Sequence, residues 1–257
     1  MSRNFELLQN AGKDQEVFQA EEVFVANEEP ATVMPAASLY EPTVPLNIGA
    51  KELEEVSKLV QRLFLVPGGA SPRSVVFTGT ESGNGCSWMC ARTAEVLAGQ
   101  VSGSVCVVDA NLRAPALHEM FGVSNRQGLS DSLRSIERIS SFAGQLSRPN
   151  LYLVSCGSPA DNWQALVSSE RMRLRLAELS SEFDYVLIDS AAMSVSSDAT
   201  VLGGSADGVV LVLKANSSRR ESARKAVHEL QTARARVLGA VLNQRTFPIP
   251  EAIYKKL

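Results

Sequence analysis

The chain has 257 residues, of which 45% are hydrophobic and 21% charged, so it can bury a core and is not disordered as a whole. Its formal net charge of −3 argues against general nucleic-acid binding through a strongly basic surface. The sequence holds no apolar run near the ~20 residues that cross a bilayer and no basic-then-apolar start typical of a signal peptide. Four cysteines are too few for a disulfide framework. We therefore expect a cytoplasmic protein with reduced thiols.

Residues 1–50 differ in composition from the rest of the chain. They carry eight acidic residues against two basic ones, a net charge of −6, and four prolines interrupt them. A stretch of this composition is predicted to order poorly on its own. The sequence thus predicts an acidic, largely disordered N-terminal tail over 1–50 and one folded domain over 51–257.

The folded part begins with an amphipathic helix, because apolar residues recur at helical spacing over 51–64. Short β-branched runs then alternate with helical patterns. Strands are predicted at 74–79, 104–110, 151–155, 185–189, 208–213 and 237–243, and further helices at 87–98, 168–180 and 219–236. This alternation predicts an α/β fold: a three-layer, doubly wound, mainly parallel sheet that binds ligands at the carboxyl ends of its strands.

A glycine-rich turn, TESGNGCS at 80–87, joins the first predicted strand to the next helix. In a phosphate loop, glycines let backbone N–H groups wrap a polyphosphate, a lysine reaches its terminal oxygens, and a Ser or Thr hydroxyl binds Mg²⁺. Gly83, Gly85 and Ser87 fit this pattern, but Cys86 stands where the lysine belongs. Taken alone, the turn is equally consistent with a tight strand-to-helix connection.

Aspartates end two of the predicted strands, Asp109 the second and Asp189 the fourth. An acid in this place can position Mg²⁺ or its waters, or orient an attacking hydroxyl. The alternative for either residue is a helix N-cap or a turn former. Two such acids behind a glycine-rich turn favour a metal–nucleotide site.

With the runs VVDANLRAP at 107–115, LHEMFG at 117–122 and GLSDSL at 128–133, the chain resembles the bacterial tyrosine kinases (BY-kinases) of capsule and exopolysaccharide synthesis. These are a branch of the MinD/ParA-like phosphate-loop (P-loop) ATPases, and the resemblance covers about residues 50–245. It implies a site for ATP or ADP with Mg²⁺. The implied catalytic residues are Asp109 and Asp189, and the implied metal ligands are Ser87, Asp109 and Asp189. The implied nucleotide-binding residues are Ser82, Gly83, Asn84, Gly85, Cys86, Ser87, Asn111, Arg113 and, near the adenine, Asn243.

The sequence departs from the family pattern at several chemical positions. Cys86 replaces the lysine, Ser82 the usual proline, and residues 189–192 read Asp-Ser-Ala-Ala where the family has Asp-Thr-Pro-Pro. Of the family's tyrosine-rich tail, Tyr254 alone remains. The oligomerisation signature Glu-x-x-Arg-x-x-Arg survives only as Glu55, Lys58 and Gln61.

These changes predict weak or absent ATPase and kinase turnover, because a neutral Cys86 cannot cancel the charge that develops on phosphates. The backbone amides of the loop can still bind a nucleotide without the lysine. Arg92, farther along the same helix, is predicted to point away from the loop. Arg113 has an alternative as a surface residue that steadies its own loop.

The resemblance favours a cytoplasmic regulator, with a degenerate phosphate loop, that docks on a membrane-embedded polysaccharide co-polymerase or chain-length regulator. The protein would reach the inner face of the membrane through that partner. Homo-oligomerisation is a further option, and no specific nucleic-acid partner is expected. The alternatives are an active tyrosine autokinase that tolerates Cys86 and a MinD/ParA-like partitioning ATPase. The basic residues over 219–236 are expected to form a helix face exposed to solvent. The alternative is that this face contacts an anionic membrane or an acidic partner.

Overall fold

The computed structural model describes residues 49–66, 68, 71–158 and 162–244. Apart from residues 49 and 50, the predicted N-terminal tail lies outside this range, and so does Tyr254. Within the described ranges, every helix is too short or too polar to pass through a bilayer.

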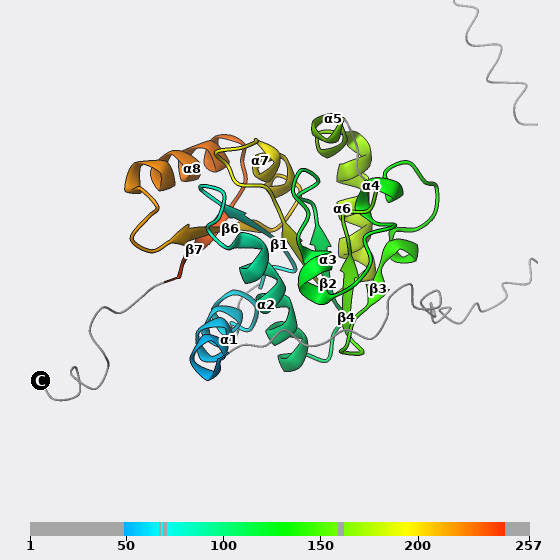
Figure 1. Cartoon of the computed structure of the whole chain (residues 1–257), viewed down its shortest axis with the longest axis horizontal. Helices are drawn as coiled ribbons and strands as arrows, with labels where there is room; N and C mark the ends of the chain where they lie inside the picture. The colour runs from blue at the N-terminus through cyan, green and yellow to red at the C-terminus, as the bar shows by residue number, and fades with distance from the viewer. Residues whose placement is uncertain (1–48, 67, 69–70, 159–161, 245–257) are drawn as a thin grey trace, which may run out of the picture. The chain divides into compact units, whose positions relative to one another are not determined.

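Seven strands form one sheet in the order β3-β4-β2-β5-β1-β6-β7 (Figure 1). The strands are β1 (Ser74–Gly79), β2 (Val105–Asp109), β3 (Gly144–Gln145), β4 (Leu151–Val154), β5 (Tyr185–Asp189), β6 (Gly208–Lys214) and β7 (Val237–Asn243). All pair in parallel except β3, which runs antiparallel to β4. The structure confirms the predicted doubly wound sheet. The strand β3 was not predicted, because two residues are too few to produce a periodic pattern.

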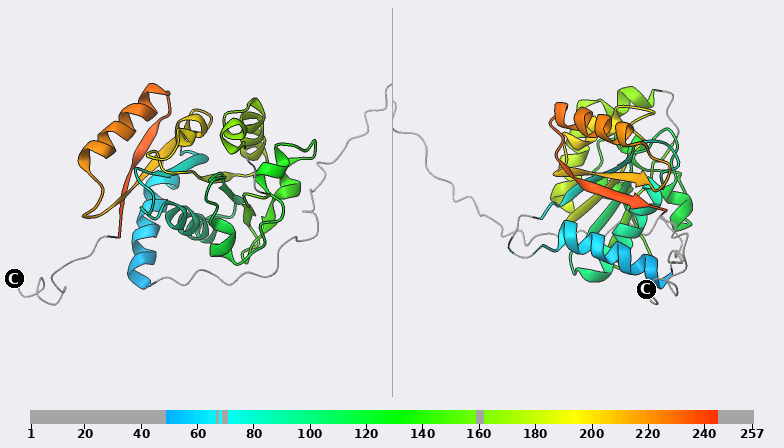
Figure 2. Two further views of the ribbon diagram at one scale, coloured as in Figure 1. Left: turned by 45° about the horizontal axis from the view of Figure 1, so that its top comes forward. Right: turned by 90° about the vertical axis from the view of Figure 1, so that its left-hand side faces the viewer.

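Helices cover both faces of the sheet, which gives the three predicted layers (Figure 2). One face carries α1 (Ala50–Phe64), α2 (Cys86–Gln100) and α3 (Leu117–Phe121). The other carries α5 (Trp163–Val167), α6 (Glu170–Glu182), α7 (Asp198–Gly203) and α8 (Arg220–Thr232). Two short turns, α4 (Leu129–Ser132) and η1 (Ile139–Phe142), precede β3. The central strands are therefore buried on both sides, which explains why their sequences are continuous apolar runs.

Two predicted helices differ from those observed. The pattern at 168–180 corresponds to α6, which begins after Ser169, whose hydroxyl caps the helix by accepting the Met172 N–H at 3.1 Å. The pattern at 219–236 continues past the end of α8 at Thr232. Arg234 there takes a left-handed φ of 60°, which turns the chain toward β7. The basic residues after Thr232 thus belong to a turn and a strand start.

Candidate functional site

The predicted phosphate loop lies between β1 and α2 at the carboxyl edge of the sheet. Gly83 and Gly85 both adopt left-handed backbone conformations, with φ of 81° and 79°. Gly85 directly precedes α2, so the unpaired N–H groups of the first helical turn open toward the loop. A Cβ atom on Gly85 would collide with the side-chain amide of Asn243, whereas Gly83 faces open space. The loop therefore has the backbone form of an anion cradle.

Asn84 anchors this loop to the last strands of the sheet. Its side chain is buried, and its amide nitrogen lies 2.9 Å from the Thr80 hydroxyl and 3.0 Å from the Val212 carbonyl. Asn243, at the end of β7, donates from its own amide to the Asn84 carbonyl at 2.9 Å. Asn84 thus turns its side chain into the protein, and Asn243 touches the loop itself. Its implied place near an adenine stays a prediction.

The two predicted aspartates are neighbours in the sheet. Asp109 ends β2, Asp189 ends β5, and they are register partners across these parallel strands. Both side chains are fully buried. Asp109 Oδ2 accepts the N–H groups of Ala116 and Leu117, each at 3.0 Å, at the start of α3. Asp109 Oδ1 and both oxygens of Asp189 accept no hydrogen bond.

Burial and proximity control the protonation of this pair. Burial raises the pKa of Asp109 to about 6. Burial first, and then the charge of Asp109, raise the pKa of Asp189 to about 8, while the nearby Ser87 hydroxyl, Cys86 thiol and Ser190 N–H act in the opposite direction. Burial and the Asp189 carboxylate in turn hold the pKa of Cys86 well above its usual value. Cys86 is therefore a neutral thiol at neutral pH, next to the Asp189 carboxyl group.

The carboxyl oxygens that receive no hydrogen bond fit a bound Mg²⁺. Magnesium prefers oxygen ligands and usually takes only one or two carboxylates from a protein, with water and phosphate oxygens completing its shell. Asp109, Asp189 and the adjacent Ser87 hydroxyl supply such a set. The described ranges hold no cluster of three or more His, Cys, Asp or Glu side chains, so an all-protein metal cage is not formed there.

A cleft of about 340 Å³ opens between the phosphate loop, the segment after β2 and the segment after β5. It is lined by Ser82, Asn111, Arg113, Ala114, Ala191, Ala192 and Val195. The cleft brings together three of the predicted site residues, Ser82, Asn111 and Arg113. The Arg113 guanidinium lies 5.4 Å from the centre of the Trp163 ring, a cation–π contact that holds the arginine at the rim.

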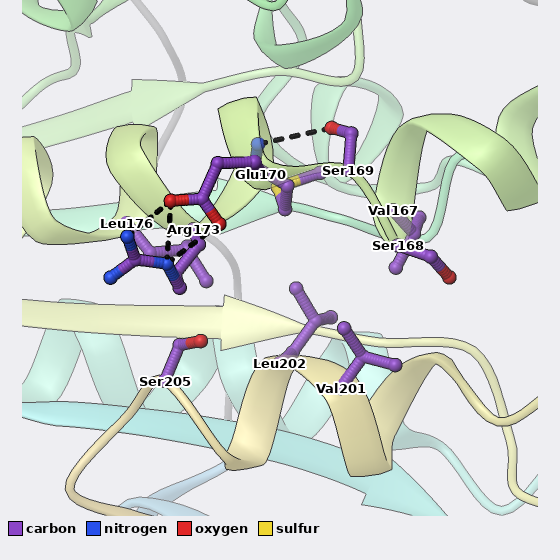
Figure 3. Close-up of a pocket in the computed structure, with 10 residues that line it drawn as sticks. Val167, Ser168, Ser169, Glu170, Arg173, Leu176, Val201, Leu202 and Ser205 are labelled. Carbon is purple, nitrogen blue, oxygen red and sulfur yellow. Dashed lines mark hydrogen bonds and ion pairs between the residues drawn. The ribbon is translucent and has the colours of Figure 1, made fainter.

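Other candidate positions are farther from this chemistry. Arg92 is buried in an ion pair with Glu95, so the prediction that it points away from the loop is confirmed. A second cavity, of about 120 Å³, lies between α5, α6 and α7 beside the Glu170–Arg173 ion pair (Figure 3). It shares no residue with the cleft. Trp163 was missed by sequence reasoning, since a lone tryptophan in a short helix carries no signal of its contact with Arg113.

Comparison with known proteins places this site in context. No family model matches the chain. Tyrosine-protein kinase YwqD of Bacillus subtilis is 32% identical over 171 residues, which cover 66% of this chain and 72% of that protein. The kinase domain of the Escherichia coli tyrosine kinase ETK superposes with a TM-score of 0.72 at 22% identity, over 81% of this chain and 85% of that one. A ParA-family ATPase from Chlorobium tepidum superposes with a TM-score of 0.55 at 20% identity, over 68% and 75%, and shares the fold alone.

Proposed function

The chain belongs to the bacterial tyrosine kinases, the BY-kinase family of P-loop proteins, and from this membership we propose a regulatory member of capsule or exopolysaccharide synthesis with weak or lost phosphotransfer. The observation that carries the proposal is the neutral thiol of Cys86, beside Asp189 at the lysine position of the loop. Loss of one well-placed donor or charge commonly costs ~2–4 kcal/mol of transition-state stabilisation, roughly a hundredfold to a thousandfold in rate.

The remaining residues keep the parts of a nucleotide site. The backbone amides of the loop at 82–87 would hold the phosphates, and Asn111 and Arg113 would line the opposite wall of the cleft. Ser87, Asp109 and Asp189 would hold Mg²⁺, which supplies positive charge to phosphate oxygens when bound. Asp109 also fixes the start of α3, so its position does not depend on a ligand.

The proposed function also includes the location of the protein, its domain division and its partners. We propose that the protein is cytoplasmic, that residues 1–50 form an acidic tail, and that the folded domain docks on a membrane-embedded co-polymerase or chain-length regulator. Self-association is part of the same proposal. The acidic composition of 1–50 and the family membership of the folded part support this division.

Calorimetric titration of ATP and ADP, with and without Mg²⁺, tests the lysine argument. The wild type is compared with Cys86→Lys, which restores the cation, and with Cys86→Ser, which removes the thiol and stays neutral. We expect weak or undetectable binding in the wild type and in Cys86→Ser, and clear Mg²⁺-dependent binding in Cys86→Lys. Equal binding in the wild type and Cys86→Lys would contradict the proposal.

An active autokinase is the second candidate, because Ser87, Asp109 and Asp189 all remain. Incubation of the full-length protein with Mg-ATP, followed by mass spectrometry of its tyrosines, separates the two. We expect little or no self-phosphorylation in the wild type. Labelling at a rate comparable to that of a family member with an intact loop would favour the active kinase.

A further inference from the structure

Positive charge is concentrated in one segment, residues 214–236, which runs from the end of β6 through α8 to the start of β7. It contains seven Lys and Arg residues against two Glu, a net charge of +5. Since the whole chain has a net charge of −3, the remaining residues together carry −8. The positive charge of this segment is therefore a local feature that the overall composition hides.

Six of these side chains are exposed, and we call them the α8 basic face: Arg219, Arg220, Arg224, Lys225, Arg234 and Arg236. Arg220 and Arg224 are one helical repeat apart, about 6 Å along the axis, and point to the same side. The opposite side of α8, with Ala226 and Leu230, is buried against the sheet. In Figures 1 and 2, α8 lies on the outside of its layer, so this face points away from the core.

The charges of the α8 basic face are almost entirely without acidic partners. Among the described residues, Lys225 forms an ion pair with Glu229 at 3.8 Å, and the five arginines form none. By contrast, two of the three arginines on α6 are paired: Arg173 with Glu170, and Arg175 with Glu178. Unpaired exposed arginines at this density leave a positive potential that an anionic partner can neutralise.

The residues of the α8 basic face argue against a protein or a nucleic acid as its partner. Protein interfaces depend on buried aromatic or aliphatic anchors, and none of the large exposed hydrophobic residues of the described chain lies on α8. Neither cavity described above includes a residue of α8, so the face offers no recess for a side chain. Nucleic-acid-binding domains are usually strongly basic overall, whereas residues 51–257 carry a net charge of only +3.

We propose that the α8 basic face binds anionic phospholipid headgroups directly at a bilayer surface. The α8 basic face has six Lys and Arg residues, of which Arg220, Arg224 and Lys225 lie on α8 itself and the others flank it. Clusters of four to eight basic residues are typical of such binding. The apolar side of α8 already packs on the sheet, so the contact is electrostatic and does not insert into the hydrocarbon. The proposal is independent of nucleotide, and it adds a membrane contact of this chain's own to any contact made through a protein partner.

Co-sedimentation of the full-length protein with vesicles tests this proposal. Vesicles of phosphatidylglycerol mixed with phosphatidylcholine are compared with vesicles of phosphatidylcholine alone, at low and high salt. We expect binding to the anionic vesicles only, weakening as salt increases. Neutralising two arginines with Arg220→Gln/Arg224→Gln should weaken the binding about 30-fold, given about 1 kcal/mol for each basic residue and 1.4 kcal/mol for each factor of ten.

The matched control is Arg126→Gln/Arg134→Gln, which removes the same charge from exposed positions far from α8 in the sequence. It should leave vesicle binding within about twofold of wild type, since screening confines the effect to nearby charges. Arg220→Lys/Arg224→Lys keeps the charge and should keep most of the binding. Absence of binding to anionic vesicles, or equal loss in both Gln pairs, would overturn the proposal. Tighter binding to duplex DNA than to the vesicles would overturn it in favour of a nucleic acid.

Discussion

Asp109 and Asp189 stand opposite each other at the ends of adjacent parallel strands, with three of their four carboxyl oxygens accepting no hydrogen bond. The charge of one buried carboxyl group therefore opposes ionisation of the other. Cys86 supplies none, because burial and Asp189 keep the pKa of its thiol high. A neutral side chain at position 86 therefore leaves the two carboxyl groups without a cation from this position of the loop.

The first prediction concerns stability against pH in the absence of Mg²⁺. The folded-state pKa values of about 6 and about 8 exceed the value near 4 of an unfolded aspartate, so the native state holds protons that the unfolded chain has released. This contribution to stability is complete below about pH 4 and is lost as the pH rises through about 8. The free energy of unfolding in urea should fall over this interval.

Asp189→Asn should flatten that dependence, because it removes the group with the higher pKa. Replacing the exposed Glu119 by Gln serves as the control and should leave the slope unchanged. A wild-type stability that rises from mildly acidic to mildly basic pH would contradict the assignment.

The second prediction compares the two left-handed glycines. Gly83→Ala and Gly85→Ala each impose backbone strain of about 1 kcal/mol, but Gly85→Ala also pushes its methyl group into the Asn243 amide. Gly85→Ala should therefore destabilise the protein by at least about 1 kcal/mol more than Gly83→Ala. Adding Asn243→Ala to each glycine variant should reduce the difference between their free energies of unfolding. Urea unfolding of the two single and the two double variants measures this difference. Equal effects of the two glycine substitutions would argue against the observed loop geometry.

The third prediction concerns the buried amide of Asn84. Asn84→Ala leaves the hydroxyl of Thr80 and the carbonyl of Val212 without this donor, and should cost about 1–3 kcal/mol of stability. Asn111→Ala is the comparison, since Asn111 is partly exposed and accepts a single longer hydrogen bond of 3.3 Å. Its effect on the free energy of unfolding should stay below about 1 kcal/mol.

The fourth prediction compares how much two arginines on α6 contribute to stability. Arg175 is largely buried and donates to the carbonyls of Ser132 and Ser135, whereas Arg173 pairs with Glu170 at the surface. Arg175→Gln should destabilise by about 1–3 kcal/mol, because it removes the part-buried hydrogen bonds that the guanidinium donates to the Ser132 and Ser135 carbonyls. Arg173→Gln should cost less than about 1 kcal/mol, as exposed ion pairs do. Thermal unfolding of the two variants checks the order, and a reversed order would be inconsistent with these contacts.

Features with a local sequence pattern could be predicted. The strands β1, β2 and β5 are buried on both faces, so each appears as an unbroken apolar run, and Asp109 and Asp189 appear as the polar residues that end two of them. Gly83 and Gly85 precede a helix in the spacing that a phosphate loop requires. In each case, the residues that determine the feature are close together in the sequence.

Contacts between distant segments could not be predicted in the same way. Arg113 meets Trp163 only because the fold places α5 beside the segment that follows β2. The chain turns after α8 at Arg234, whose backbone is left-handed. Arginine seldom adopts this conformation, so the sequence does not indicate where the helix ends. The short β3 owes its existence to pairing with β4 and has no periodicity of its own.

The hydrogen bond between Asn243 and the Asn84 carbonyl joins residues 159 positions apart. The phosphate loop is synthesised early in the folded domain, and its partner in this bond is the final residue of β7, the last strand of the described residues. This hydrogen bond can therefore form only after nearly the whole domain has been synthesised. Chains that stop short of β7 would leave the Asn84 carbonyl without its partner, so completion of the cradle coincides with completion of the sheet.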